Sequence, residues 1–130
     1  MTWRRNVVLV PFATLALAGL GACGGGGGAT SCPAKVATKT ATAGAISVCA
    51  YDLAFDVNTI KAQPGPLKVT LVNRSNLYHT FKVLKTSFEL EANAGKTESG
   101  SVTLAKGTYT FECTVPGHAA AGMKGKIEVG

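Results

Sequence analysis

The chain has 130 residues, of which 46% are hydrophobic, and a formal net charge of +6 at pH 7. Its positive charges are scattered, and no aromatic residues alternate with them as they do in many nucleic-acid-binding segments. We therefore expect no nucleic-acid partner, although a mildly positive surface favours anionic lipid headgroups or an acidic protein. The length is sufficient for one small domain.

Residues 1–22 have the character of an export signal. Arg4 and Arg5 form a short basic region, and the apolar run of residues 7–17 is too short to span a bilayer. Residues 20–23, Leu-Gly-Ala-Cys, resemble the bacterial lipoprotein signal, in which the cysteine is lipidated and becomes the new N-terminus. This resemblance implies a lipid anchor at Cys23 and a protein exported to the outer face of the bacterial cell membrane, or to the periplasm. An ordinary secretory signal or an uncleaved anchor is the alternative.

Residues 23–45 are predicted to form a flexible tether. Five consecutive glycines occupy positions 24–28, and a stretch rich in Ala, Thr, Ser and Lys follows them. This composition buries too little apolar surface to offset the entropy that is lost on ordering. The root-mean-square reach of such a tether is on the order of 25 Å, so a domain beginning at residue 46 could reorient near the membrane.

Residues 46–130 are predicted to form an all-β domain. Apolar and polar residues alternate in several short runs, among them residues 67–71, 102–104 and 127–129. Segments rich in Pro, Gly and Asn separate these runs and are typical of turns. Many short strands at such intervals predict a Greek-key β-sandwich. No segment has convincing helical periodicity, although residues 86–95 are ambiguous.

Four potential metal ligands are spread over this domain. Cys113, His118 and Met123 follow one another at a C-x4-H-x4-M spacing, and His79 is the only other histidine. A thiolate, imidazoles and a thioether together suit copper that alternates between Cu(I) and Cu(II). Strand alternation directs His79 and Cys113 towards the interior. A buried cysteine or a core methionine is by itself commonplace, but this set uses both histidines and the only methionine after Met1.

Two cysteines remain once the candidate lipid anchor and the candidate copper ligand are set aside. Cys32 and Cys49 can form a disulfide in an exported protein. The alternative is two free thiols. A bridge would close a loop of about 17 residues and stabilise the domain by roughly 3 kcal/mol. It would also hold part of the tether against the first strand of the domain.

The ligand segments, residues 73–83 and 107–125, resemble those of type 1 blue-copper proteins, the cupredoxins. The loop Cys-Thr-Val-Pro-Gly-His-Ala-Ala-Ala-Gly-Met is most similar to the ligand loops of rusticyanin and sulfocyanin. The resemblance implies one copper ion, with three equatorial ligands and one axial ligand. The equatorial ligands would be His79, Cys113 and His118, and the axial ligand would be Met123.

Two further residues have expected roles beside the ligands. In many cupredoxins Asn or Ser follows the first histidine and braces the ligand loop, whereas this chain has Thr80 there. Because hydrogen bonds to the thiolate tune the reduction potential, the hydroxyl of Thr80 is expected to act with a different reach. The backbone carbonyl of Tyr78 is a candidate for a second weak axial contact.

A closed mononuclear site implies one-electron transfer and not enzymatic catalysis, because four protein ligands leave no position for a substrate. Copper nitrite reductases and multicopper oxidases need further histidines, and a dinuclear copper site needs a second cysteine in the loop. We expect a membrane-tethered, monomeric electron carrier whose partner is a redox protein such as a c-type cytochrome or a terminal oxidase. The edge of His118 would be the electron port. Residues that either frame this port for docking or merely pack against the site are Val115, Pro116, Ala119 and Ala120.

Two other functions remain open. A copper-carrying lipoprotein would deliver metal to a respiratory oxidase or protect against copper, although such carriers tend to expose spare Met and His side chains. A metal-free β-sandwich interaction module would be favoured by the fold alone.

Overall fold

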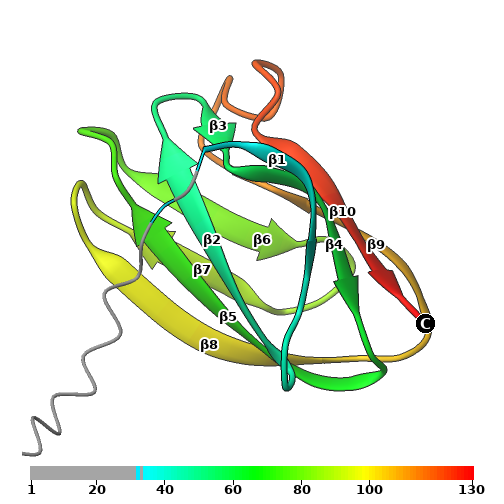
Figure 1. Ribbon diagram of the computed structural model, residues 1–130. Helices are drawn as coiled ribbons and strands as arrows, with labels where there is room; N and C mark the ends of the chain where they lie inside the picture. Colours follow the sequence, from blue (N-terminus) through cyan, green and yellow to red (C-terminus); the bar gives the residue numbers. More distant parts are fainter. Residues whose placement is uncertain (1–31, 33) are drawn as a thin grey trace, which may run out of the picture.

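Ten strands form two sheets in the computed structural model, which describes Cys32 and residues 34–130 (Figure 1). The six-stranded sheet has the order β1 (Val36–Thr40), β4 (Val57–Ala62), β10 (Lys124–Val129), β9 (Gly107–Glu112), β6 (His79–Val83) and β7 (Glu89–Ala92). The four-stranded sheet has the order β3 (Ala54–Phe55), β2 (Ala45–Tyr51), β5 (Gly65–Asn73) and β8 (Thr97–Leu104).

The predicted all-β sandwich is confirmed. The ambiguous segment 86–95 contains strand β7, and no helix able to span a membrane occurs in the part of the chain that the structure describes. The chain passes repeatedly from one sheet to the other, and three neighbouring pairs are parallel: β1 with β4, β10 with β4, and β2 with β5. These crossings place β6 beside β9, so the two strands that lead to the candidate ligands are hydrogen-bonded neighbours.

Three phenylalanines fill the core beneath the candidate ligands. Phe55, Phe81 and Phe111 are each at most 2% exposed, and their ring centroids are 4.8 to 5.6 Å apart. Burial of such rings is a large favourable contribution to folding. His79 lies on the same side of β6 as Phe81, and Cys113 continues the inward alternation of Phe111. Both candidate ligands are fully buried, as the alternation predicts.

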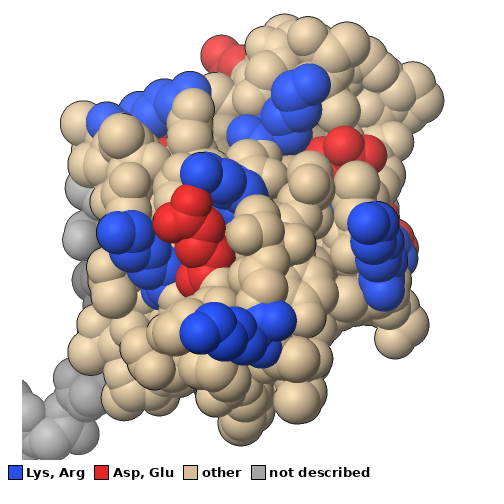
Figure 2. Space-filling view, turned by 90° about the vertical axis from the view of Figure 1, so that its right-hand side faces the viewer, with Lys and Arg blue, Asp and Glu red and all other residues tan. Residues whose placement is uncertain are grey.

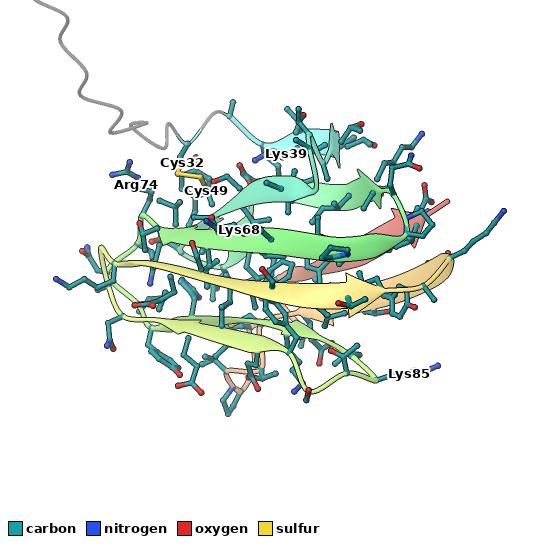
Figure 3. All side chains as sticks on the ribbon, turned by 90° about the horizontal axis from the view of Figure 1, so that it is seen from below. Cys32, Lys39, Cys49, Lys68, Arg74 and Lys85 are labelled. Atoms are coloured by element: carbon teal, nitrogen blue, oxygen red, sulfur yellow. A yellow bond between two sulfur atoms is a disulfide. The ribbon has the colours of Figure 1, made fainter. Side chains whose placement is uncertain are left out.

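The folded domain begins earlier than the sequence indicates. Strand β1 lies within residues 23–45, the predicted flexible tether, and it pairs in parallel with β4. The predicted disulfide between Cys32 and Cys49 is present and joins the segment before β1 to β2 (Figure 3). The tether prediction is therefore wrong for residues 36–40, because a covalent link and strand pairing offset the entropy of ordering them.

A buried ion pair also holds β1. Asp56 is completely buried, accepts the backbone N–H of Cys49 at 3.0 Å and pairs with Lys39 of β1. The ammonium group of Lys39 also donates to the backbone carbonyl of Ser47 at 2.9 Å. The predicted signal peptide, residues 1–22, and the predicted lipid anchor, Cys23, lie outside the described residues.

Charged side chains of both signs are interspersed on the face of the molecule that Figure 2 shows. Across the six-stranded sheet, for example, Lys124 is paired in register with Glu112, and Glu128 with Lys61. Such alternation lowers the local potential that any one lysine contributes. The charges on this face therefore do not indicate a concentrated basic binding surface.

Candidate metal centre

Three potential ligand atoms converge at one end of the sandwich. His79 begins β6, Cys113 directly follows β9, and His118 lies in the loop that leads to β10. The Sγ atom of Cys113 is 3.9 Å from Nδ1 of His79 and 3.5 Å from Nδ1 of His118. Among the described residues this is the only group of three or more His, Cys, Asp or Glu side chains so arranged.

The loop from residue 113 to residue 123 is closed by backbone hydrogen bonds. Cys113 N donates to the carbonyl of Met123 at 3.0 Å, and Met123 N donates to the carbonyl of His118 at 3.0 Å. Gly117 has a φ of +86°, which a side chain would disfavour, and this allows the chain to turn back before His118. The C-x4-H-x4-M spacing is therefore the spacing of a closed loop, and it ends in a fully buried Met123.

Ser75 fixes the orientation of the His79 ring. Its Oγ lies 2.8 Å from His79 Nε2, and carbonyl oxygens of Asn73 and Leu77 lie 3.0 and 3.2 Å from the same Oγ. In the tautomer that carries its hydrogen on Nε2, the ring donates to Ser75 Oγ, and the Ser75 hydroxyl donates to one of those oxygens. The lone pair of Nδ1 is left directed at the Cys113 sulfur, which is how a metal-binding histidine is prepared.

The neutral form of His79 is favoured. Burial lowers the pKa of its imidazole, and the nearby His118 lowers it further, against weaker opposing effects of a backbone hydrogen bond with Tyr51 and the charge of Asp52. The two imidazole centroids are 5.1 Å apart. Neutral imidazole is the form that binds metal ions. The lowered pKa therefore keeps the His79 imidazole in the form that can bind a metal ion.

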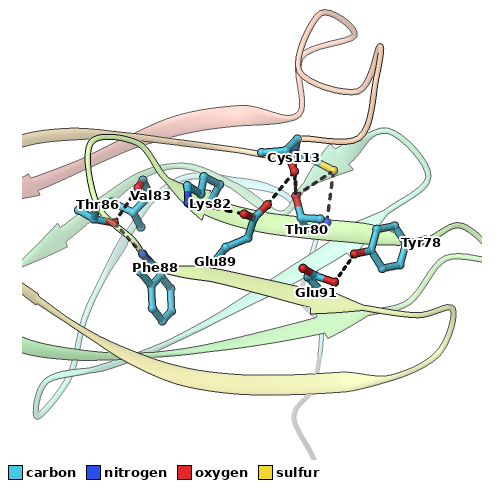
Figure 4. A network of polar contacts seen from close by, with 10 residues as sticks. Tyr78, Thr80, Lys82, Val83, Thr86, Phe88, Glu89, Glu91 and Cys113 are labelled. Carbon is cyan, nitrogen blue, oxygen red and sulfur yellow. Dashed lines mark hydrogen bonds and ion pairs between the residues drawn. The ribbon is translucent and has the colours of Figure 1, made fainter.

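Thr80 lies beside the Cys113 sulfur, as the sequence predicts. Its backbone N–H donates to Sγ at 3.4 Å, while its hydroxyl oxygen is 3.9 Å from Sγ (Figure 4). The hydroxyl instead braces the ligand loop, because Thr80 Oγ1 accepts the backbone N–H of Thr114 at 2.8 Å and is 2.8 Å from Thr114 Oγ1. Strand alternation places Thr80 on the opposite side of β6 from His79. Thr80 is nevertheless almost completely buried, because the ligand loop packs against it.

The other predicted residues are at or near the surface. Tyr78 is 41% exposed, and the hydrogen bond that its hydroxyl donates to Glu91 Oε2 at 2.7 Å raises the pKa of Tyr78 to about 12. The axial contact through the Tyr78 carbonyl stays a prediction. Around His118, the side chains of the predicted docking residues range from half-buried to exposed: Val115, Pro116, Ala119 and Ala120.

Sequence reasoning missed three residues that support the ligands. Asn73 and Ser75 belong to a stretch whose composition predicts only a turn, yet Asn73 is 1% exposed and binds three backbone carbonyls through its Nδ2. Glu89 accepts a hydrogen bond from Thr114 Oγ1 at 2.7 Å. In the sequence, the only indication of these supporting roles was the polar Asn-x-Ser pattern of residues 73–75, which precedes His79.

The two sulfur–nitrogen distances fit one ion that is bound to the sulfur and both nitrogens. A trigonal ion about 2.3 Å from sulfur and about 2.0 Å from nitrogen, as for zinc, places sulfur and nitrogen about 3.7 Å apart. The observed separations of 3.5 and 3.9 Å lie on either side of this value. The soft sulfur donors Cys113 and Met123 favour copper over harder ions.

Comparison with known proteins agrees with this geometry. Residues 42–130 match the family described as copper-binding proteins of the plastocyanin/azurin family. A segment of 40 residues is 60% identical to auracyanin-B of Chloroflexus aurantiacus, a match that spans 28% of this chain and only 16% of auracyanin-B.

Solved structures of two related types share the fold. The reduced auracyanin of the photosynthetic bacterium Roseiflexus castenholzii has a TM-score of 0.64 at 23% identity, covering 69% of this chain and 98% of that chain. Reduced rusticyanin has a TM-score of 0.60 at 24% identity, covering 72% of this chain and 84% of that chain. Together with the family match and the ligand cluster, this shows that the chain belongs to the plastocyanin/azurin family of copper-binding proteins, the cupredoxins, and that its cofactor is copper.

Proposed function

We propose that this protein is a mononuclear type 1 copper protein that carries single electrons between redox partners. The observation that carries this proposal is the convergence of one buried thiol sulfur and two imidazole nitrogens within 4.8 Å of one another. Copper, when bound, supplies the one-electron oxidation and reduction. Relatives of this family that share the fold, auracyanin and rusticyanin, were both crystallised in a reduced state, which agrees with a redox role.

The chain's own contribution is a rigid set of ligands. His79, Cys113 and His118 would be the equatorial ligands, and Met123 the axial one. Ser75 holds the His79 ring, and backbone hydrogen bonds close the loop that carries the other three residues. Because these contacts are made within the protein and not to the ion, little rearrangement would accompany each electron. Four protein ligands leave no position for a substrate, so the protein would be an electron carrier and not an enzyme.

Electrons would enter and leave through the exposed edge of His118. The loop residues around it are small or apolar, with Val115 and Ala119 half-buried and Pro116 and Ala120 exposed. Two exposed leucines also lie in loops, Leu53 between β2 and β3 and Leu77 shortly before His79. An apolar surface around His118 would suit brief docking of a redox protein, such as a c-type cytochrome or a terminal oxidase. The carrier would act as a monomer.

The protein would act outside the cytoplasm, tethered through Cys23 to the outer face of the cell membrane. The disulfide between Cys32 and Cys49 supports an oxidising compartment. Since β1 begins at Val36, the length available for a tether is shorter than residues 23–45. Mass spectrometry of the protein purified from membranes would test the anchor. A lipid adduct on Cys23 is expected, and an unmodified chain that begins elsewhere would contradict it.

The visible spectrum of the Cu(II)-loaded domain tests the proposed function. An intense thiolate-to-copper charge-transfer band is expected, and it should disappear in Cys113→Ser because the band requires the thiolate. A wild-type protein that binds copper but is colourless would refute the type 1 assignment. Copper delivery is the competing function, and it predicts rapid transfer of the ion to a metal-free acceptor. An electron carrier should instead exchange electrons much faster than it releases copper.

A further inference from the structure

Glu89 is held rigidly at the start of β7, next to the ligand loop. It is paired in register with Lys82 of β6, and its Oε2 lies 3.6 Å from the Lys82 ammonium group. The turn between these strands is fixed by Thr86, whose hydroxyl donates to the Val83 carbonyl at 2.7 Å and accepts the Phe88 N–H at 3.1 Å (Figure 4). Lys82 and Glu89 are 24% and 29% exposed, so both side chains are half-buried.

A chain of hydroxyl groups connects Glu89 to the surroundings of the thiolate. Thr114 Oγ1 lies 2.7 Å from Glu89 Oε1 and 2.8 Å from Thr80 Oγ1, and Thr80 Oγ1 lies 3.9 Å from Cys113 Sγ (Figure 4). Each hydroxyl has a single hydrogen to donate. The direction of one hydrogen bond therefore determines the direction of the next.

The carboxylate sets that direction. It has no hydrogen, so the hydrogen between Thr114 and Glu89 belongs to Thr114. Thr114 then has no hydrogen left for Thr80, so a hydrogen bond between the two threonines uses the hydrogen of Thr80. This hydrogen has two acceptors within reach, and Thr114 Oγ1 at 2.8 Å is much nearer than Cys113 Sγ at 3.9 Å. The nearer donor to the sulfur is the Thr80 backbone N–H at 3.4 Å, and the hydroxyl contact at 3.9 Å is long and competes with the shorter contact to Thr114.

We propose that Glu89 is a positioning residue that keeps the Thr80 hydroxyl turned away from the thiolate and thereby lowers the reduction potential of the copper site. This inference rests on the proposed type 1 function. A hydrogen bond to the thiolate withdraws electron density from it and favours the less positive ion, Cu(I). A carboxylate that withholds this bond favours Cu(II).

Glu89→Gln is expected to reverse the direction of the hydrogen bonds between residue 89, Thr114 and Thr80. The ammonium group of Lys82 attracts the oxygen of the new amide, so the amide nitrogen faces Thr114 and donates to it. Thr114 then donates to Thr80, and the Thr80 hydrogen is free to turn to the sulfur. Thr114→Val is expected to have the same end effect, because it removes the acceptor of the Thr80 hydrogen while keeping the backbone N–H that holds Thr80.

The test is the reduction potential and the visible spectrum of the copper-loaded protein and its variants. Glu89→Gln should displace the equilibrium with a one-electron mediator about tenfold towards Cu(I), equivalent to a rise of about 59 mV, and should move the charge-transfer band to shorter wavelength. Glu91→Gln is the matched control, since it removes a charge from the same strand at a residue bonded to Tyr78 and not to Thr114. It should give a clearly smaller shift.

A double-mutant cycle separates the hydroxyl chain from a simple charge effect. In the Thr114→Val background, Glu89→Gln should add no more than Glu91→Gln does. Equal shifts for Glu89→Gln and Glu91→Gln, or fully additive shifts in the cycle, would overturn the proposal. If Glu89→Gln does not fold, the test rests on Thr114→Val alone. An unchanged reduction potential and an unchanged charge-transfer band in Thr114→Val would then overturn the proposal. A wild-type protein without the thiolate band would overturn the proposed function, and this inference with it.

Discussion

Two buried polar clusters differ in how completely the protein satisfies them. The anchoring cluster, Lys39, Cys49 and Asp56, joins β1 to the sandwich, and both oxygens of the buried carboxylate have partners within the chain. The metal cluster, His79, Cys113 and His118, faces three potential ligand atoms towards one another, with sulfur–nitrogen distances of 3.9 and 3.5 Å. These contacts are long for hydrogen bonds between the side chains themselves, whereas a shared metal ion would satisfy all three atoms.

The comparison separates stability from function. Contacts of the anchoring cluster hold the N-terminal segment and do not touch the ligands, so their loss should lower the free energy of unfolding and leave the copper spectrum unchanged. Loss of contacts in the metal cluster should instead change the binding or the spectrum of copper and have a smaller effect on the free energy of unfolding. Three variants test this division, and a fourth tests the contact of Tyr78, the residue before His79.

The largest loss of stability is expected for Lys39→Met. It leaves Asp56 completely buried without its charged partner, and breaking a buried pair in this way lowers the free energy of unfolding by about 3–5 kcal/mol. Urea denaturation of the metal-free protein measures it. Lys35→Met, at an exposed position before β1, is the control. Equal stability of the two variants would show that the ion pair does not anchor β1.

Removal of the disulfide by Cys32→Ala together with Cys49→Ala comes next. The loop that it closes spans 17 residues, and its loss should lower the free energy of unfolding by about 3 kcal/mol. The charge-transfer band of the copper-loaded variant should match the wild type. A shifted band would mean that the two clusters are coupled and that the division between them is wrong.

Ser75→Ala should give the reverse pattern. It deprives His79 Nε2 of the hydroxyl that lies 2.8 Å away, and loss of such a contact lowers metal affinity about 10–100-fold. Competition with a copper chelator measures the affinity. Ser99→Ala removes an exposed serine hydroxyl that contacts only Thr70 among the described hydrogen bonds, and it should leave the affinity unchanged. Equal affinities of both variants would contradict the role of Ser75.

The smallest effect is expected for Glu91→Gln on Tyr78. Loss of the carboxylate acceptor should lower the Tyr78 pKa from about 12 towards its ordinary value of 10.0. Because the neutral phenol makes this bond, its stabilisation is fully present below pH 10 and is lost as the pH rises through about 12. Ultraviolet absorbance titration follows the ionisation. An unchanged titration would show that Glu91 does not hold the phenol in solution.

Local chemistry made much of the site predictable from sequence. The donor types of Cys113, His118 and Met123, and their spacing within one loop, are properties of adjacent residues. Strand alternation placed His79 inward without knowledge of its neighbours. The all-β class followed from short alternating runs, and the pairing of Cys32 with Cys49 followed from the number of cysteines that remained.

Only the tertiary structure decided where the fold begins and how the ligands are tuned. Strand β1 is ordered by a disulfide and an ion pair that each join residues 17 positions apart, which composition does not reveal. The hydrogen bond from Thr114 to Glu89 joins residues 25 positions apart. The direction in which a hydroxyl donates depends on which acceptor the folded strands place beside it. The sequence by itself therefore determined which residues are the candidate copper ligands, and the packing of the strands determined which of their atoms converge and what surrounds them.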